Sequence, residues 1–403
     1  MMFKPLKDIT VLDLTQVLAG PFGSYQLSFL GAKIIKIENP DQGDWARKGG
    51  DDKELSDNLM GTSFLVQNSN KRSIRLDLKN NTGKSIFKRL AIKADVIIEN
   101  MTPGKFAKLG FSFDNLKKLN PKIILCAISA YGQNGDLGVR PAYDHVIQAA
   151  SGIMSTTGTN ITGPLKVGAP YIDYATGLNA AFAITAAISN LQKDETAQWL
   201  DVSMYDTSLM LMSSLVSTSI NSDVILKPKG NEAWSGSPSS GCFEASCGNL
   251  LAIAANTESQ FNMLCKTIFE KKENYTEKWM DINYRKKHQN TLRNKIGLVI
   301  KTNTAEFWER KLNDNFVPAS KVKAFKEVVF ENHFKQRKNW IKSYLEKYEK
   351  SYMVPSLSFK VNNSKIDKIT PPPELGENTA EILEEFNFTK FEIKKFFNKK
   401  VAF

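Results

Sequence analysis

The sequence is poor in the residues that build disulfide scaffolds and metal sites. Four cysteines and three histidines occur among 403 residues, and no histidine lies near the loose pair Cys242 and Cys247. A disulfide framework needs more cysteine in a chain of this length, and a zinc site needs about four closely spaced ligands. We therefore expect reduced thiols and no bound metal.

Long hydrophobic runs are also missing. The most apolar stretches, 178–188 and 208–216, are well short of the ~18 to 20 residues that span a bilayer. The opening residues carry no apolar segment with a small-residue cleavage site, as a secretory signal would. The sequence therefore predicts a cytoplasmic protein that does not cross a membrane.

Common phosphate-binding and nucleophile motifs are absent too. The glycine turn at 16–23 lacks the GxGxxG spacing of dinucleotide sites, which disfavours an NAD dehydrogenase. No GxxxxGK[ST] or GxSxG segment occurs, so nucleotide-phosphatase and hydrolase functions lose their main support. The histidines form no HExxH pair either.

Positive charge is in excess, because 54 Lys and Arg stand against 42 Asp and Glu, for a net charge of +12. The lysines are spread along the chain and thicken only near the C-terminus. Surfaces that track a phosphate backbone cluster their cations and interleave aromatics or arginines. We expect no nucleic-acid partner, whereas a small anionic ligand is compatible with this charge.

Apolar runs alternate with helical stretches through the first half of the chain. The composition, 42% apolar and 24% charged, is that of a globular protein, and the length favours two domains. Continuous Val, Ile and Leu runs between helices are typical of a parallel sheet covered on both faces, so we predict an α/β fold. We expect strands at 10–15, 33–38, 73–78, 95–100, 122–129 and 198–204.

Clusters of turn-forming residues interrupt the second half of the chain. Residues 227–241 are rich in Gly, Ser and Pro and predict a domain boundary. A β-hairpin is expected to turn at 247–249, with helices following near Gln260 and Ala305. Three prolines at 371–373 separate this region from two final amphipathic helices.

Asp173 is the carboxylate that stands out. The pattern places it where a strand ends and a long apolar helix begins. A helix N-terminus favours the ionised carboxylate, and an ionised carboxylate can attack an electrophile such as a thioester. An aspartate at this position is also an ordinary helix cap, so spacing alone leaves both interpretations open. Glu38 is interpreted as a solvent-exposed carboxylate at a strand end rather than as a ribose-binding acid.

Several blocks of the sequence resemble the CaiB/BaiF family of class III CoA transferases, which includes formyl-CoA and carnitine CoA transferases. The resemblance extends from residue 5 to the C-terminus, although Asn378 stands where the family usually has histidine. The matching blocks lie at 5–47, 70–79, 94–110, 119–135, 141–152, 167–177 and 375–388.

This resemblance implies a Rossmann-like large domain with a parallel sheet, a smaller α+β domain and an interlocked homodimer. The domains are expected at 1–200 for the large CoA-binding domain, 201–226 for a helical linker, 227–328 for the small domain and 329–403 for a segment that returns to the large domain.

The resemblance also implies transfer of CoA from an acyl-CoA thioester to a free carboxylic acid. Asp173 falls on the catalytic aspartate of the family, which attacks the thioester to form a mixed anhydride and then an aspartyl-CoA thioester. Coenzyme A is therefore a substrate, and no tightly bound cofactor is expected.

The family pattern assigns CoA contacts residue by residue. Lys108 is expected to bind an adenosine-side phosphate, and Tyr131 is expected near the thioester. We take the backbone of 16–19 as the source of oxyanion donors. The remaining assigned contacts are Val17, Leu18, Ala19, Asn39, Leu76, Lys79, Asn100, Met101 and Ser129.

Departures from the pattern bear on the substrate. Formyl-CoA transferases carry glutamine where Leu18 stands, arginine where Asn39 stands and a four-glycine loop where this chain has 235–241, which disfavours oxalate and formate exchange. The segment 230–238 favours larger or dicarboxylic acyl groups, such as succinyl-CoA.

Other functions remain as alternatives. An α-methylacyl-CoA racemase would place histidine where Tyr143 precedes Asp144, and tyrosine is a poor base near neutral pH. A non-catalytic CoA-binding protein would be favoured only without Asp173.

Overall fold

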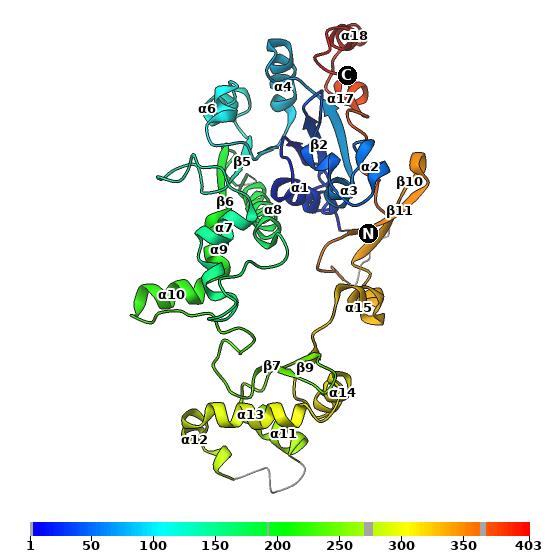
Figure 1. Ribbon diagram of the computed structural model, residues 1–403. Coiled ribbons are helices and arrows are strands. Elements are labelled where there is room, and N and C mark those ends of the chain that lie inside the picture. The colour runs from blue at the N-terminus through cyan, green and yellow to red at the C-terminus, as the bar shows by residue number, and fades with distance from the viewer. Residues whose placement is uncertain (1–2, 192, 270–276, 363–367) are drawn as a thin grey trace. The chain divides into compact units, whose positions relative to one another are not determined.

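The computed structural model describes residues 3–191, 193–269, 277–362 and 368–403. The chain forms two units, which are described separately (Figure 1). The first unit comprises Met1–Ile153, Lys166–Val224 and Lys338–Phe403, and the second comprises Met154–Leu165 and Ile225–Arg337.

A six-stranded sheet organises the first unit. Its strand order is β3-β2-β1-β4-β5-β6, and every neighbouring pair is parallel. The order reverses between β1 and β4, so the loops that follow these two strands leave the sheet at a switch point, where α/β proteins bind ligands. This confirms the expected α/β class. The strands are β1 Thr10–Asp13, β2 Lys33–Glu38, β3 Lys71–Arg75, β4 Val96–Glu99, β5 Ile124–Ser129 and β6 Gln198–Ser203.

Neighbouring residues of each strand enter different cores. Val11 and Ile34 belong to one cluster of buried side chains, whereas Leu12 and Ile35 belong to another. Because successive side chains of a strand point to opposite faces, the two clusters cover the two faces of the sheet. This is why the strands read as continuous apolar runs in the sequence.

Helices supply the rest of both cores. Helices α1 and α8 contribute to one cluster, and α4, α17 and α18 contribute to the other (Figure 1). The helices of this unit are α1 Ala19–Phe29, α2 Lys53–Asp57, α3 Thr62–Asn68, α4 Asn81–Lys93, α5 Lys105–Lys108, α6 Phe113–Leu119, α7 Asp144–Ala150, α8 Tyr171–Leu191, α9 Met204–Leu211, α10 Ser213–Asn221, α17 Thr379–Glu385 and α18 Lys390–Asn398.

Two glycines let α1 and α8 pack closely. A Cβ added at Gly23 would lie 2.8 Å from the Gly177 carbonyl oxygen, and one at Gly177 would lie 2.5 Å from the Ala19 carbonyl oxygen. Only glycine fits where two backbones approach in this way. The contact brings the first turns of α8 next to the start of α1.

Shorter elements complete the first unit. A two-stranded antiparallel sheet packs against α3 and α1 through Leu345 and Val354. These elements are β10 Trp340–Leu345, β11 Lys350–Pro355 and the 3-10 turns η1 Trp45–Lys48, η2 Ile153–Thr156 and η5 Glu346–Tyr348, of which η2 extends into the second unit.

The second unit has a sheet and a core of its own. Strands β7 and β8 form the expected hairpin, and β9 pairs with β8. Phe243, Leu251 and Trp308 lie in the buried cluster between this sheet and its helices. The elements are β7 Gly241–Glu244, β8 Leu250–Ile253, β9 Ala319–Lys321, α11 Glu258–Ile268, η4 Glu277–Met280, α12 Ile282–Lys287, α13 Gln289–Ile300, α14 Ala305–Asp314, α15 Phe325–Phe330 and α16 Asn332–Arg337.

The expected strand before Asp173 is wrong. Residues 166–170 are irregular and, apart from Val167 and its hydrogen bond to Gln148, largely exposed. Helix α8 begins at Tyr171, directly after Pro170, which makes Asp173 its third residue. A strand needs a neighbour for its backbone groups, and this segment pairs with none in the described chain.

All four cysteines are free, in agreement with the expected reduced thiols. Within the described residues, no group of three or more His, Cys, Asp or Glu is placed to hold a metal ion. Across the same residues, no helix has the length and apolarity that a bilayer crossing requires.

Candidate active site

Two loops meet at the switch point of the sheet. The loop after β1 contains Gln16, and the loop after β4 begins with Asn100. The Gln16 N–H donates to Asn100 Oδ1 at 3.0 Å, and Asn100 Nδ2 donates to the Gln16 carbonyl oxygen at 2.9 Å. This reciprocal pair joins the two loops and forms one edge of a cavity.

That cavity brings the predicted nucleophile to the predicted binding loops. It has a volume of about 340 Å³ and is lined by Asp173 from α8. Six predicted CoA contacts line the same cavity: Val17, Leu18, Ala19, Asn100, Met101 and Ser129. Arg140 and Tyr143 add a cation and a phenol to its wall.

The other predicted contacts do not line this cavity. Leu76 is a core residue that is only 2% exposed. Asn39, Lys79 and Lys108 are exposed at other places on the unit. Tyr131 is half-buried, with its ring centroid 5.9 Å from that of Tyr205. Whether these residues contact CoA stays a prediction.

Burial sets the charge state of Asp173. Removal from solvent, assisted by the nearby Asp144 carboxylate, raises the pKa of Asp173 from its ordinary 3.8 to about 7. Strongly shifted carboxylates in cavities are candidates for catalytic groups. The carboxylate therefore gains its charge only around neutral pH.

Asp144 is a buried residue of the site that the sequence did not reveal as part of it. Its Oδ2 accepts hydrogen bonds from the N–H of Ile172 at 2.7 Å and of Asp173 at 3.2 Å. Its Oδ1 accepts from Gln148 Nε2. Asp144 thus supplies from α7 the cap that the first turn of α8 needs. Only proximity in the fold, and no local spacing, reveals this role.

Three buried ion pairs lie beneath the loop after β1. Lys36 contacts Asp44 at 2.8 Å, and Lys71 contacts Asp13 at 2.9 Å, with all four side chains fully buried. Glu38 pairs with Arg47 at 2.7 Å. Burial alone would raise the pKa of Asp13 and of Glu38, but the neighbouring cations hold both below their ordinary values.

Glu38 corrects an expectation. It is not a solvent-exposed strand end but a residue only 3% exposed. Arg47 reaches both carboxylate oxygens at 2.7 Å, and the Ser73 hydroxyl donates to Oε1 at 2.6 Å. A carboxylate can be buried here because every oxygen has a charged or hydroxyl donor.

Hydrogen bonds within the loop after β1 reduce the set of N–H groups at 16–19 that could serve as oxyanion donors. The Gln16 N–H is taken by Asn100, and the Val17 N–H donates to Asp44 Oδ1 at 2.9 Å. The N–H groups of Leu18 and Ala19 have no acceptor in the described chain, and both residues line the cavity. These two groups, at the start of α1, are the donors that remain for an oxyanion.

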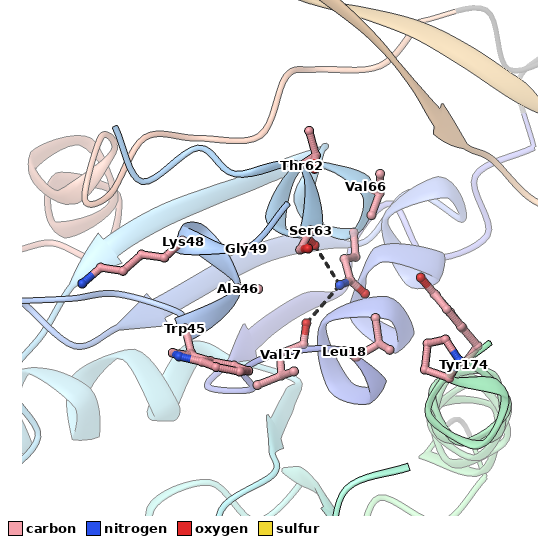
Figure 2. A pocket seen from close by; sticks show the side chains of 12 residues that line it. Val17, Leu18, Trp45, Ala46, Lys48, Gly49, Thr62, Ser63, Val66 and Tyr174 are labelled. Carbon is pink, nitrogen blue, oxygen red and sulfur yellow. Dashed lines mark hydrogen bonds between the residues drawn. The ribbon is translucent and has the colours of Figure 1, made fainter. Parts of the chain in front are cut away.

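A second cavity lies on the other side of Val17 and Leu18. It has a volume of about 580 Å³ and shares these two residues with the first cavity. Figure 2 shows the side chains that line it. Trp45, Ser63 and Tyr174 are among its other walls. Figure 2 shows the Lys48 side chain extending away from Val17 and Leu18. Tyr174 follows Asp173 in α8, so the second cavity adjoins the helix that carries Asp173.

Comparison with known proteins decides the family. The sequence pattern of CoA-transferase family III matches residues 6–379. The chain belongs to this family. It is therefore a CoA-transferase, an enzyme that moves CoA between acyl-CoA thioesters and carboxylic acids. The resemblance found in the sequence is confirmed.

Relatives of this CoA-transferase cover nearly its whole length. It is 32% identical over 393 residues to succinyl-CoA:glutarate CoA-transferase of Mus musculus, which covers 95% of this chain and 86% of the relative. Succinate–glutarate CoA-transferase of Agrobacterium fabrum (strain C58) is 30% identical, covering 94% of this chain and 95% of the relative. A CaiB/BaiF family protein from Brucella suis has a crystal structure that matches with a TM-score of 0.81 at 26% identity, covering 95% and 99% of the two chains.

Proposed function

We propose that this CoA-transferase moves CoA from a dicarboxylyl-CoA such as succinyl-CoA to a free dicarboxylic acid, with Asp173 as the covalent carrier. The observation that carries this proposal is the cavity in which the Asp173 carboxylate meets the loops after β1 and β4. The ring of six predicted contacts around it supports a thioester-sized ligand at this position.

The chemistry needs no group beyond the carboxylate and the two substrates. A carboxylate oxygen of Asp173 attacks the thioester carbonyl carbon, the C–S bond breaks, and CoA leaves as a thiolate. The thiolate then attacks the Asp173 carbonyl carbon of the mixed anhydride and expels the donor acid. The acceptor carboxylate attacks the carbonyl carbon of the resulting aspartyl-CoA thioester, the C–S bond breaks, and a second mixed anhydride forms. The released thiolate attacks the acceptor's carbonyl carbon in this anhydride, which yields the new acyl-CoA and frees the Asp173 carboxylate.

Negative charge develops on an acyl oxygen at each of these steps. Leu18 and Ala19 line the same cavity as Asp173, and their N–H groups are unengaged by described residues. Prearranged donors of this kind stabilise such charge at no reorganisation cost. We assign them as the oxyanion donors.

Cations in the cavity support a dicarboxylic substrate. Lys105 and Arg140 line it. A second carboxylate on the acyl chain would find a partner there. The second cavity, beside Val17 and Leu18, offers further space for the acid. The names of the mouse and Agrobacterium relatives point to the same substrate class.

A homodimer is proposed as the working form. Phe182 on α8 is 73% exposed, and Met210 on α9 and Ile220 at the end of α10 are exposed by 72% and 76%. Helix α9 contacts both α8 and α10, and exposed apolar side chains on helices in contact are typical of a protein interface. Covering by a second, interlocked copy accounts for them, and native mass spectrometry should show the dimer. We also propose a cytoplasmic location, with no nucleic-acid partner.

CoA exchange is the test. Purified protein is incubated with succinyl-CoA and a panel of mono- and dicarboxylic acids, and new acyl-CoAs are followed by mass spectrometry. Hydroxylamine or borohydride added during turnover should mark Asp173. Asp173→Asn should lose exchange by about 10³-fold or more, whereas Asp114→Asn, a first-turn aspartate of α6 outside the cavity, should not.

Three outcomes would refute parts of this proposal. Exchange that survives in Asp173→Asn excludes the covalent mechanism, and α-proton exchange without CoA transfer indicates a racemase. Arg140→Met should raise KM for dicarboxylic acceptors about tenfold and leave monocarboxylic acceptors unaffected. Equal effects on both acids would remove Arg140 from the substrate site.

A further inference from the structure

Val17 has a backbone conformation that its side chain disfavours. Its φ is +73°, in the left-handed region. Valine is branched at Cβ, and such residues rarely adopt this region because Cβ crowds the backbone. A strained residue of this kind persists only when its surroundings hold it in place.

Two buried side chains hold both peptide groups of Val17. Asp44 Oδ1 accepts from the Val17 N–H at 2.9 Å, and Gln67 Nε2 donates to the Val17 carbonyl oxygen at 3.0 Å. Asp44 and Gln67 are exposed by only 1% and 2%. Without these partners the two peptide groups would be free to rotate, and Val17 would relax to an ordinary conformation.

The two partners are themselves fixed. Gln67 Nε2 also donates to the Ser63 carbonyl oxygen at 2.9 Å, so two carbonyls determine which end of the amide faces Val17 (Figure 2). Asp44 Oδ1 also accepts from the Ala46 N–H, and Lys36 contacts its other oxygen at 2.8 Å. Lys36 Nζ in turn donates to the Thr15 carbonyl oxygen.

The turn at Val17 determines where the next N–H groups point. Helix α1 begins at Ala19, two residues later, and Leu18 and Ala19 line the Asp173 cavity. We propose that Gln67 and the Asp44–Lys36 pair are positioning residues, which hold Val17 in the left-handed conformation and thereby aim the Leu18 and Ala19 N–H groups at the acyl group on Asp173. This inference rests on the function proposed above.

A double-mutant cycle tests the inference. Glycine adopts the left-handed region about as readily as any other, so a residue that holds Val17 matters less when position 17 is glycine. The four proteins are the wild type, Gln67→Met, Val17→Gly and the double variant. Methionine has the length of glutamine but donates no hydrogen bond.

The effect of Gln67→Met on kcat should differ between the wild-type and the Val17→Gly backgrounds. Gln67→Met should lower kcat about 10-fold in the wild-type background with little change in the KM for acyl-CoA, because misplaced donors act on the transition state. In the Val17→Gly background the same change should lower kcat by less than about 3-fold. Equal losses in both backgrounds, or an effect on KM alone, would overturn the inference.

A second variant and a control guard against general destabilisation. Gln67→Asn keeps the amide but shortens its reach, and it should reproduce the kcat loss if Gln67→Met does not fold. Ser69→Ala removes a buried hydroxyl at the end of the same helix, whose hydrogen bond to Leu65 is remote from the loop. It should leave kcat unchanged, and an equal kcat loss there would overturn the inference.

Thermal unfolding separates this inference from the proposed function. The drop in Tm caused by Gln67→Met should be smaller in the Val17→Gly background, and this holds whether or not the protein transfers CoA. A wild type without CoA exchange would refute the proposed function, while the Tm cycle would still report on how Gln67 holds Val17. Equal Tm drops in both backgrounds would refute that positioning role itself.

Discussion

The two sides of the cavity use buried charge in opposite ways. Under the loop after β1, every buried carboxylate has a cation within 2.9 Å. At the start of α8, the charged neighbour that shifts the pKa of Asp173 is another carboxylate, Asp144. The ion pairs hold the loop after β1 in one conformation. Asp173, which has no such ion pair with a described residue, titrates near neutral pH.

Removing one cation from the paired side should lower the free energy of unfolding more than any other change considered below. Lys36→Met leaves Asp44 buried without its cation, and removing one partner of a buried pair costs about 3–5 kcal/mol. Urea titration should show this loss in the free energy of unfolding. The double variant Lys36→Met, Asp44→Asn should recover part of it, and a single-variant loss below about 1 kcal/mol would mean that the pair behaves like a surface pair.

On the unpaired side, removing the charge of Asp173 should raise the stability of the fold instead of lowering it. Because the pKa of Asp173 is about 7 in the fold and its ordinary value is 3.8, ionisation in the fold opposes stability. The penalty is absent below about pH 4, grows between about pH 4 and 7, and is complete above about pH 7. Asp173→Asn removes the charge and should raise Tm at pH 8 by about 2–4 °C, with no gain at pH 4.

A pH-independent gain in Tm would contradict this account. So would a loss at pH 8, since it would mean that the ionised carboxylate is stabilised in the fold. Asp114→Asn, at an exposed first turn, serves as the control for removing a carboxylate from a helix start.

A smaller effect is expected on the pH dependence of catalysis. In the wild type, kcat/KM for acyl-CoA should rise with pH through about 7, as Asp173 ionises. Asp144→Asn removes the neighbouring negative charge and should move this rise to lower pH by less than about one unit, because burial is the larger cause of the shift. A rise that moves to higher pH would show that Asp144 acts through its hydrogen bonds to α8 instead.

Much of the fold could be predicted because its signals are local. The runs around Ile97 and Leu125 are continuously apolar, as strands buried on both faces must be, and glycine or asparagine turns separate them from helices. Asp173 could be singled out only by resemblance, since its local pattern is also that of a helix cap. The strand predicted before it failed because an apolar run such as 167–172 carries no information about a pairing partner.

Contacts that charged residues make with other parts of the chain could not be predicted. Lys36 and Glu38 alternate with apolar residues on β2 and so read as solvent-facing, yet both are buried because partners arrive from Asp44 and Arg47 in the following loop. Asp144 likewise acts on a helix that begins 27 residues later, at Tyr171. Such contacts depend on how elements meet, which no spacing along the chain reveals.

The glycine contact between α1 and α8 has a consequence for altering this enzyme. Neither Gly23 nor Gly177 has room for even a methyl group, so the helix contact that sets Asp173 beside the loop after β1 cannot be adjusted. New acid preferences, whether selected in nature or in the laboratory, have to be sought in the walls beyond it, at positions such as Trp45, Ser63 and Arg140.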